Sequence, residues 1–413
     1  MNNETEIKVI YLNNWLSGSW EVQKIHAQEF ITAFEKQKKV RIFTYPKNQR
    51  IDLNNKSINQ TINRFGTCKI NLKKCIAKFP KTKIDKLLRN KKLEDIKNEI
   101  NQIKPHVILI RHNIFYFKII EKILKFGIPI VLEVNGLVHN DSDEINQKNR
   151  EEIIKYEKNI FSKVSAICCV SHNIAKSIKG MGIDSTKISV VPNGANPSKF
   201  FPHEKSQKLC KKYDLDGQIV VGYVGGFDNS KSEGRDVITM LKAFEISKKI
   251  TKHPVKLFMV GRIDEKFLRR IIKNLEINNS VVFTGFIEHY KLPKIMNLID
   301  IAVAPYFEKR LKNASPMKLF EYMAMEKAVI IPKVGQVIKI VKNMESAVFV
   351  ETENILSLSD ALSMLIKNSD LRKKLGRNAR ILIKKKYTWE HNAMRIATVC
   401  RNVIERHLQQ QNL

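Results

Sequence analysis

Short apolar runs alternate with longer amphipathic segments along almost the whole 413-residue chain, and this alternation constrains the fold more than any other feature. The apolar runs are only a few residues long and rich in Ile and Val, as buried strands are. Strands that alternate with helices are typical of parallel sheets covered by helices on both faces. The sequence therefore predicts an α/β protein.

The expected strands fall into two series. The first series comprises residues 7–12, 40–45, 107–110, 129–134, 167–170 and 188–191. The second comprises residues 219–224, 255–260, 281–284, 301–304 and 328–331. Helical patterns between and after them include residues 22–36, 236–249, 292–298, 356–367 and 388–413. Because the chain is too long for one ordinary domain, two series predict two doubly wound domains.

The segment 193–217 is the expected boundary between the two domains. It begins with a Pro-Asn-Gly turn signal at residues 192–194, contains two further prolines and shows no clear hydrophobic periodicity. We therefore expect an N-terminal domain over residues 1–200 and a C-terminal domain over residues 201–389.

The chain is strongly basic, with 73 Lys and Arg against 41 Asp and Glu and a formal net charge of +32. Such a charge attracts nucleic acid, anionic membranes or phosphorylated substrates, although a compositional bias toward Lys, Ile and Asn explains the excess equally well. The most basic run, from Lys69 to Lys92, carries an intermittent apolar face broken by Pro80. It is either a surface that contacts anionic membranes or a solvated helix face. Phe79 is its one aromatic residue, which argues against nucleic acid.

The cysteines and the hydropathy pattern bear on where the protein works. The six cysteines show no metal-ligand spacing, and Cys168 and Cys169 lie in an apolar run that we interpret as a buried strand. No apolar stretch approaches the about 18 to 20 residues that a transmembrane helix needs, and the N-terminus is polar. We expect a cytoplasmic protein that is soluble or peripheral on the inner face of the membrane.

The stretch from Ser315 onward is predicted to be a helix that starts at the end of a strand. Ser315 is a favoured N-cap, and Pro316 is favoured at the first helical position. A helix N-terminus at the carboxyl edge of a parallel sheet suits a phosphate, and Lys318 adds a mobile cation. Glu321 shares the face of Lys318, where its carboxylate can accept hydrogen bonds from a ribose diol. These residues indicate a nucleotide-diphosphate site; the alternative is a capped helix with a surface ion pair.

Residues 315–330 (SPMKLFEYMAMEKAVI) resemble the donor-site helix of family-4 retaining glycosyltransferases of the GT-B fold. Other stretches resemble the interdomain segment, glycine turn, base-side loop and tail of that family, at residues 191–200, 223–227, 282–286 and 371–389. The resemblance is good over residues 165–400. It is looser before that, where it rests mainly on Gly18, His26 and residues 131–135.

The resemblance implies a GT-B architecture: two doubly wound Rossmann-like domains facing across a cleft, with the last helix, residues 390–413, crossing back to the first domain. It also implies that the C-terminal domain binds a nucleotide-diphosphate sugar and the N-terminal domain an acceptor, a glycan or a lipid-linked one. Neither a metal nor another cofactor is expected. The DxD spelled by residues 141–143 is interpreted as chance.

The resemblance assigns roles to individual residues of the C-terminal domain. Glu321 matches the glutamate expected to hold the donor ribose, and Lys318 the cation on the diphosphate. Eight positions before Glu321 the family usually has another glutamate, and this chain has Asn313. The identity of the donor sugar is therefore not determined by the resemblance. Arg235 and Lys231 compete for a second diphosphate cation, and we prefer Arg235 because it stands at a helix entry. The remaining expected donor-binding residues are Ser315, Pro316, Met317, Gly226 and Phe286.

The N-terminal domain offers weaker candidates. His139, a few residues after the expected strand 129–134, is the best candidate for a catalytic contact with the donor sugar or the acceptor. The expected acceptor-side residues are Gly18, His112 and Asn135. No convincing nucleophile is found, which fits a retaining reaction in which the departing diphosphate takes the acceptor's proton.

The leading hypothesis is a retaining, metal-independent hexosyltransferase that acts in cell-surface polysaccharide biosynthesis. A nucleotide-sugar epimerase of the same fold would need an acid–base pair that the sequence does not declare. A non-catalytic sugar-nucleotide binder, or a subunit of a transferase complex, is supported only by Asn313. A nucleic-acid-binding protein would need aromatic residues interleaved with its basic run.

Overall fold

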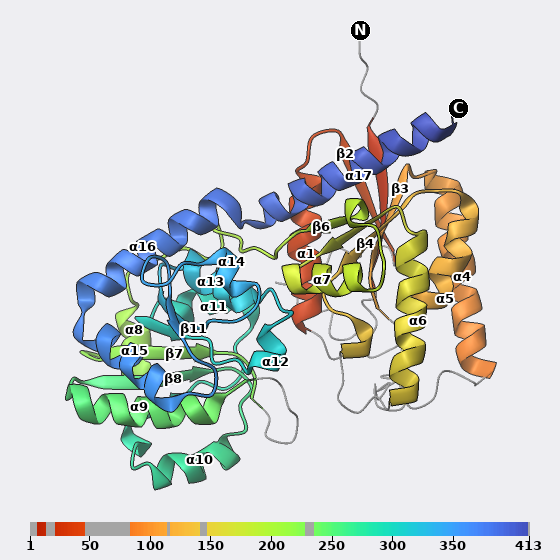
Figure 1. Ribbon diagram of the computed structural model, residues 1–413. Coiled ribbons are helices and arrows are strands. Elements are labelled where there is room, and N and C mark those ends of the chain that lie inside the picture. The colour runs from red at the N-terminus through yellow and green to blue at the C-terminus, as the bar shows by residue number, and fades with distance from the viewer. Residues whose placement is uncertain are drawn as a thin grey trace. The chain divides into compact units, whose positions relative to one another are not determined.

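The computed structural model describes residues 6–13, 21–45, 83–113, 116–140, 147–227 and 235–411 (Figure 1). The chain forms two compact units, Met1–Pro192 with Trp389–Leu413 and Asn193–Thr388. The break between them follows Pro192, somewhat before the boundary expected after residue 200.

Within the described residues, six parallel strands form the sheet of the first unit, in the order β2-β1-β3-β4-β5-β6. The strands are β1 (Ile7–Leu12), β2 (Val40–Tyr45), β3 (Val107–Arg111), β4 (Ile130–Val134), β5 (Ala166–Cys169) and β6 (Ile188–Val190). The strand order reverses between β1 and β3, and ligands of such sheets bind beyond the carboxyl ends of the strands at that point.

Helices cover both faces of the first sheet. One face packs against α4 (Lys83–Ile103), α5 (Phe117–Ile123), α6 (Gln147–Lys163) and α7 (His172–Gly180). The other face packs against α1 (Glu21–Glu35) and the last helix, α17 (Trp389–Gln411). Here the Tyr11 and Phe30 rings meet edge to face, 5.1 Å apart, and Trp389 packs on His26. The C-terminal helix thus returns to the first unit, as the family resemblance implied.

The second unit repeats the arrangement with six parallel strands among the described residues, in the order β12-β11-β10-β7-β8-β9. The strands are β7 (Ile219–Val224), β8 (Val255–Val260), β9 (Val281–Phe283), β10 (Ile301–Val303), β11 (Ala328–Pro332) and β12 (Val348–Val350). The strand order reverses at β7, between β8 and β10. β12 was not predicted, because its three residues are too few to show a strand period.

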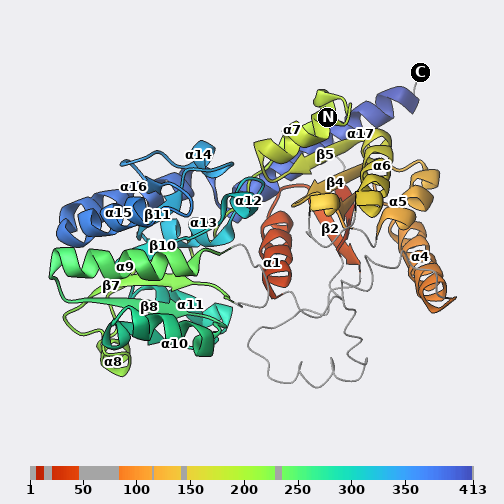
Figure 2. The same ribbon diagram turned by 60° about the horizontal axis from the view of Figure 1, so that its bottom comes forward.

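Two sets of helices sandwich the second sheet (Figure 2). One apolar cluster joins the sheet to α9 (Val237–Thr251), α10 (Glu265–Asn274) and α15 (Ile355–Lys367). The cluster on the opposite face joins it to α11 (Leu292–Met296), α13 (Met317–Ala324) and α16 (Ser369–Lys386). Shorter helices are α8 (Gln207–Lys212), α12 (Glu308–Leu311) and α14 (Val337–Ile340). Two Rossmann-like units, the predicted fold class, are therefore confirmed.

The two ends of the second unit are joined by a close backbone contact. Ala195 N–H donates to the Tyr387 carbonyl at 3.0 Å. Gly194 lies so near the same segment that a Cβ there would be 2.6 Å from the Thr388 carbonyl carbon. Only glycine fits this position without a backbone shift, which gives the Pro-Asn-Gly signal a packing reason.

Two further expectations concerned the adjacent cysteines and the absence of membrane-spanning helices. Cys168 and Cys169 lie buried in β5, as the apolar run predicted. Within the described residues, every helix is too short or too polar to cross a lipid bilayer.

Candidate functional site

Glycines follow three neighbouring strands of the second sheet at its carboxyl edge. Gly225, Gly261 and Gly285 follow β7, β8 and β9, and their loops bond to one another through Gly225 N–H to Val260 O at 2.9 Å and Gly261 N–H to Gly285 O at 3.1 Å. Gly261 has a φ of 135°, and a Cβ on it would collide with the Gly225 carbonyl oxygen. Backbone of this kind lets a ligand approach the sheet closely.

Helix α13 is fixed to this edge by hydrogen bonds. The Val224 N–H at the end of β7 donates to Tyr322 Oη at 2.7 Å. The hydroxyl and carbonyl oxygens of Ser315 accept from the backbone and side-chain amides of Asn193, at 3.0 and 2.8 Å. Two buried polar contacts therefore set where the first turn of α13 begins.

The prediction that Ser315 caps this helix was wrong. The helix begins at Met317, Pro316 occupies the N-cap position, and no side chain caps the first turn. The Ser315 hydroxyl is instead committed to Asn193. The first-turn N–H groups therefore lack a side-chain acceptor and keep the positive end of the helix dipole available to an anion.

Glu321, on α13, is a buried carboxylate with two basic partners. Its side chain is buried, with 3% of the residue exposed, yet both carboxylate oxygens are bonded. His289 Nε2 lies 2.9 Å from Oε1 and Lys318 Nζ donates to Oε2 at 2.6 Å. Burial alone would raise the pKa of Glu321, but Lys318 and His289 outweigh it and lower the pKa to about 2. The carboxylate is ionised at neutral pH and each oxygen retains acceptor capacity for a diol.

The other expected donor-side residues lie on neighbouring loops. Arg235 pairs with Tyr306 in a backbone bridge and places its guanidinium 4.0 Å from the centre of the Tyr306 ring. Phe286 is 43% exposed, and the Arg262 guanidinium lies 4.5 Å from the centre of its ring. Asn313 is half-buried in the loop before α13. Gly226 accepts a hydrogen bond on its carbonyl oxygen from Tyr223 Oη at 2.6 Å. Lys231 lies outside the described residues.

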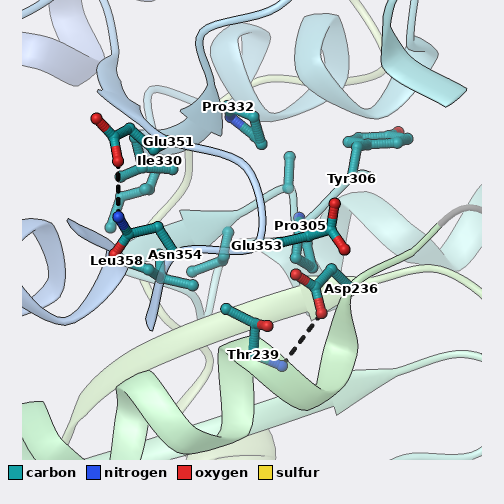
Figure 3. A pocket seen from close by; sticks show the side chains of 13 residues that line it. Asp236, Thr239, Pro305, Tyr306, Ile330, Pro332, Glu351, Glu353, Asn354 and Leu358 are labelled. Atoms are coloured by element: carbon teal, nitrogen blue, oxygen red, sulfur yellow. Dashed lines mark hydrogen bonds between the residues drawn. The ribbon is translucent and has the colours of Figure 1, made fainter. Parts of the chain in front are cut away.

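A cavity of about 20 Å³ opens at the carboxyl ends of β10, β11 and β12 (Figure 3). Asp236, which caps α9 through the Thr239 N–H, lies there beside Glu353. Glu351 accepts from Asn354 Nδ2 at 2.6 Å. The described residues that line the cavity are apolar, polar or acidic, with no Lys or Arg. The cavity has room for little more than one water and repels phosphate, so it is not the diphosphate site.

The first unit places both predicted histidines around one buried carboxylate. The carboxylate belongs to Glu157 on α6, and its Oε1 lies 2.9 Å from His112 Nε2. The Val138 N–H donates to the same oxygen at 2.7 Å. Glu157 Oε2 bonds to His139 Nδ1. The His112 side chain is fully buried, which leaves its predicted contact with an acceptor without support, whereas that of His139 is 11% exposed.

A second buried carboxylate in this unit, Glu133 at the end of β4, holds Asn135. Asn135 Nδ2 donates to Glu133 Oε1 at 2.7 Å, and Tyr11 Oη donates to Oε2 at 2.5 Å. Burial raises the pKa of Glu133, but the charges of Arg111 and His26 act against burial and lower the pKa overall. The predicted acceptor-side residue Asn135 is thus oriented by a buried charge network.

Three of these residues, His289, Arg262 and Glu157, were not among the site residues expected from the sequence. His289 and Arg262 each follow a strand of the second sheet by a few residues, which is the position that could have singled them out. Glu157 carries no local signal, because it sits on an ordinary amphipathic helix. Gly18 and residues 141–143 lie outside the described residues.

Two six-stranded parallel sheets of Rossmann type, as the described residues of this chain form them, are the architecture of the GT-B fold. HepE of Anabaena, solved in complex with UDP and glucose, shares the fold with a TM-score of 0.65 and 15% identity, over 96% of this chain and 100% of that one. Residues 23–199 match the family model described as Glycosyltransferase Family 4, and residues 205–382 match the model described as Glycosyl transferases group 1. The chain belongs to family 4 of the GT-B glycosyltransferases.

Two curated relatives are more similar to this chain in sequence than HepE is. An uncharacterized glycosyltransferase of Methanocaldococcus jannaschii is 23% identical over 280 residues, which are 65% of this chain and 66% of the relative. The N,N'-diacetylbacillosaminyl-diphospho-undecaprenol alpha-1,3-N-acetylgalactosaminyltransferase of Campylobacter jejuni is 23% identical over 245 residues, 57% of this chain and 61% of the relative. The chain thus spans less than two thirds of the length of each of these relatives.

Proposed function

We propose that this protein is an enzyme that transfers a hexose-type sugar from a nucleotide-diphosphate donor to a hydroxyl of a glycan or lipid-linked acceptor, with retention of configuration. The observation that carries the proposal is the ionised Glu321, buried between Lys318 and His289 beside an uncapped helix N-terminus. A carboxylate that accepts the two ribose hydroxyls, next to groups that attract a diphosphate, suits a sugar nucleotide better than a single phosphate.

In the proposed reaction, the bond between the sugar C1 and the diphosphate oxygen breaks while a bond from the acceptor oxygen to C1 forms on the same face. The departing diphosphate takes the proton of the acceptor hydroxyl. Negative charge grows on the diphosphate, where Lys318, Arg235 and the first turn of α13 stabilise it. We propose that these groups stabilise the charge and that no metal takes part.

The names of the relatives support the substrate classes. The Campylobacter relative is named for a lipid-diphosphate-linked acceptor, and HepE was solved with UDP. We therefore propose a lipid-linked acceptor and a role in the biosynthesis of cell-surface polysaccharide.

The test is incubation of the full chain with a panel of UDP-, GDP- and ADP-sugars and a polyprenyl-diphosphate-linked N-acetylhexosamine. We expect one donor to release nucleotide diphosphate and to label the lipid with an anomeric configuration equal to that of the donor. Lys318→Met should abolish this release, whereas Lys266→Met, an exposed lysine on α10, should not. Nucleotide binding without turnover of any donor would favour the non-catalytic binder. An epimerised sugar nucleotide as product would favour the epimerase.

A membrane-contact role is proposed for the basic run from Lys69 to Lys92. Of this run, the part before Lys83 lies outside the described residues, and α4 begins at Lys83. We expect the protein to pellet with anionic vesicles, but not with neutral ones, and to be released by salt. Lys73→Glu with Lys74→Glu should weaken pelleting more than the same change at Lys384 and Lys385 on α16. Equal weakening would indicate attraction by net charge alone.

A further inference from the structure

The bonding around Glu157 specifies where protons lie on two histidines. Burial raises the pKa of Glu157, but the hydrogen bonds from His112 and His139 outweigh burial and lower the pKa to about 2. An ionised carboxylate can only accept hydrogen bonds. The ring nitrogens that face it, His112 Nε2 and His139 Nδ1, therefore both carry hydrogen.

The two histidines then differ in their second nitrogen. The Nδ1 of His112 is buried and has no hydrogen-bond partner within the described part of the chain. A proton there would be a buried donor without an acceptor, which is costly, so His112 is neutral. Its ring packs between Phe117 and Phe161, with centroids 5.3 and 5.1 Å away. His112 therefore anchors Glu157 in the core and does not reach a ligand.

His139 has the opposite arrangement. It lies in a short 3-10 turn (Val138–Asn140) after β4, at the carboxyl edge of the first sheet, where ligands of parallel sheets bind. Its Nδ1 points to Glu157, its side chain is partly exposed, and its Nε2 has no hydrogen-bond partner among the residues described. In the neutral ring this Nε2 is a lone-pair acceptor held in a fixed direction.

We infer that Glu157 is a positioning residue, which holds His139 in the tautomer protonated at Nδ1 and thereby presents Nε2 as a hydrogen-bond acceptor to a sugar hydroxyl. This inference rests on the proposed function for the identity of the ligand. Its structural half, the tautomer, follows from the contacts and the ionised state of Glu157 and does not depend on the ligand. The Val138 N–H bond to the same carboxylate ties the turn that carries His139 to α6, so Glu157 fixes the ring's position as well as its proton.

The matched perturbation is Glu157→Gln, which preserves shape but adds a donor. The amide oxygen of Gln can keep the bonds from Val138 N–H and His112 Nε2–H, and its NH₂ group then faces His139 Nδ1. That nitrogen must become an acceptor, so the proton of the neutral ring moves to Nε2, which can no longer accept from a hydroxyl. Comparable amide-for-carboxylate changes beside catalytic histidines act through the tautomer while the geometry stays intact.

The first measurement is NMR of the full chain labelled with ¹⁵N-histidine, with the His139 signals assigned by their loss in His139→Asn. The wild type should show the proton of His139 on Nδ1, and Glu157→Gln should show it on Nε2. Glu152→Gln, an exposed glutamate on the same helix, should leave the tautomer unchanged. A wild-type His139 protonated at Nε2 would overturn the inference even if Glu157→Gln failed to fold.

The second measurement is kinetic and uses the donor found active in the panel. For Glu157→Gln we expect kcat to fall about 10- to 100-fold with an unchanged Kd for the nucleotide. A fall in donor hydrolysis as well as transfer assigns the hydroxyl to the donor sugar, and a fall in transfer alone assigns it to the acceptor. Unchanged rates despite a flipped tautomer would refute the inference that Nε2 acts as a hydrogen-bond acceptor, because a hydroxyl can also accept from an Nε2–H. If the wild type turned over no donor, the proposed function would fail, and the tautomer would still decide whether Glu157 positions His139.

Discussion

Replacing Glu321 with Gln isolates the electrostatics of the donor-side site. The amide keeps the size of the side chain and resembles the protonated acid, but it removes the charge that faces Lys318 and His289. The structure lowers the pKa of Glu321 from its ordinary 4.5 to about 2. Since one pH unit of pKa is worth about 1.4 kcal/mol, the folded state favours the ionised form by about 3 kcal/mol. We expect Glu321→Gln to cost about that much stability at pH 7.

The pH dependence follows from the direction of this shift. A group whose pKa is lower in the folded state stabilises the fold fully above its unfolded pKa, 4.5, and loses this contribution as the pH falls toward the folded pKa, about 2. The difference in stability between wild type and Glu321→Gln should therefore be constant from pH 7 to about pH 5. It should narrow to about 2 kcal/mol at pH 3.5.

The assay is urea unfolding followed by circular dichroism, with hydrogen exchange in β7 and α13 peptides to read the second unit separately. Glu265→Gln is the matched control, because Glu265 forms an exposed pair with Arg269 at 2.9 Å, worth at most about 0.5 kcal/mol. Equal losses in the two variants, or a difference that does not narrow in acid, would refute the view that Glu321 is an ionised buried carboxylate.

Three further changes test other parts of the molecule. Arg235→Ala should weaken UDP binding about 10- to 100-fold by calorimetry, because a charge-assisted contact is worth about 1.5 to 3 kcal/mol; an equal loss of affinity in Lys266→Ala would show that Arg235 acts only through the net charge of the protein. Gly194→Ala should lower stability by about 1 to 3 kcal/mol through its clash with backbone. Gly180→Ala, where a Cβ meets nothing within 4 Å, should not lower it, and matching melting temperatures would contradict the packing argument. Tyr11→Phe should cost about 1.5 to 3 kcal/mol of unfolding free energy, because it removes a hydrogen bond to a buried carboxylate; an unchanged urea midpoint would show that bond to be dispensable.

The sequence by itself determined the architecture and much of the donor-side edge. Strand and helix periods are local, so β1, β2, β7 and β8 lie at the residues expected from their apolar runs. The 3-residue spacing of Lys318 and Glu321 likewise determined that the two side chains meet, because helix geometry alone places them on one face.

The tertiary structure alone decided which distant side chains share a bond. Ser315 looked like a helix cap, but Asn193, 122 residues away, takes its hydroxyl. His289 reaches Glu321 across 32 residues, and Glu157 gathers His112 and His139 from loops after two different strands. Local periodicity shows where elements begin and end, whereas a buried carboxylate's partners depend on how the elements pack, and burial is what makes those partners obligatory.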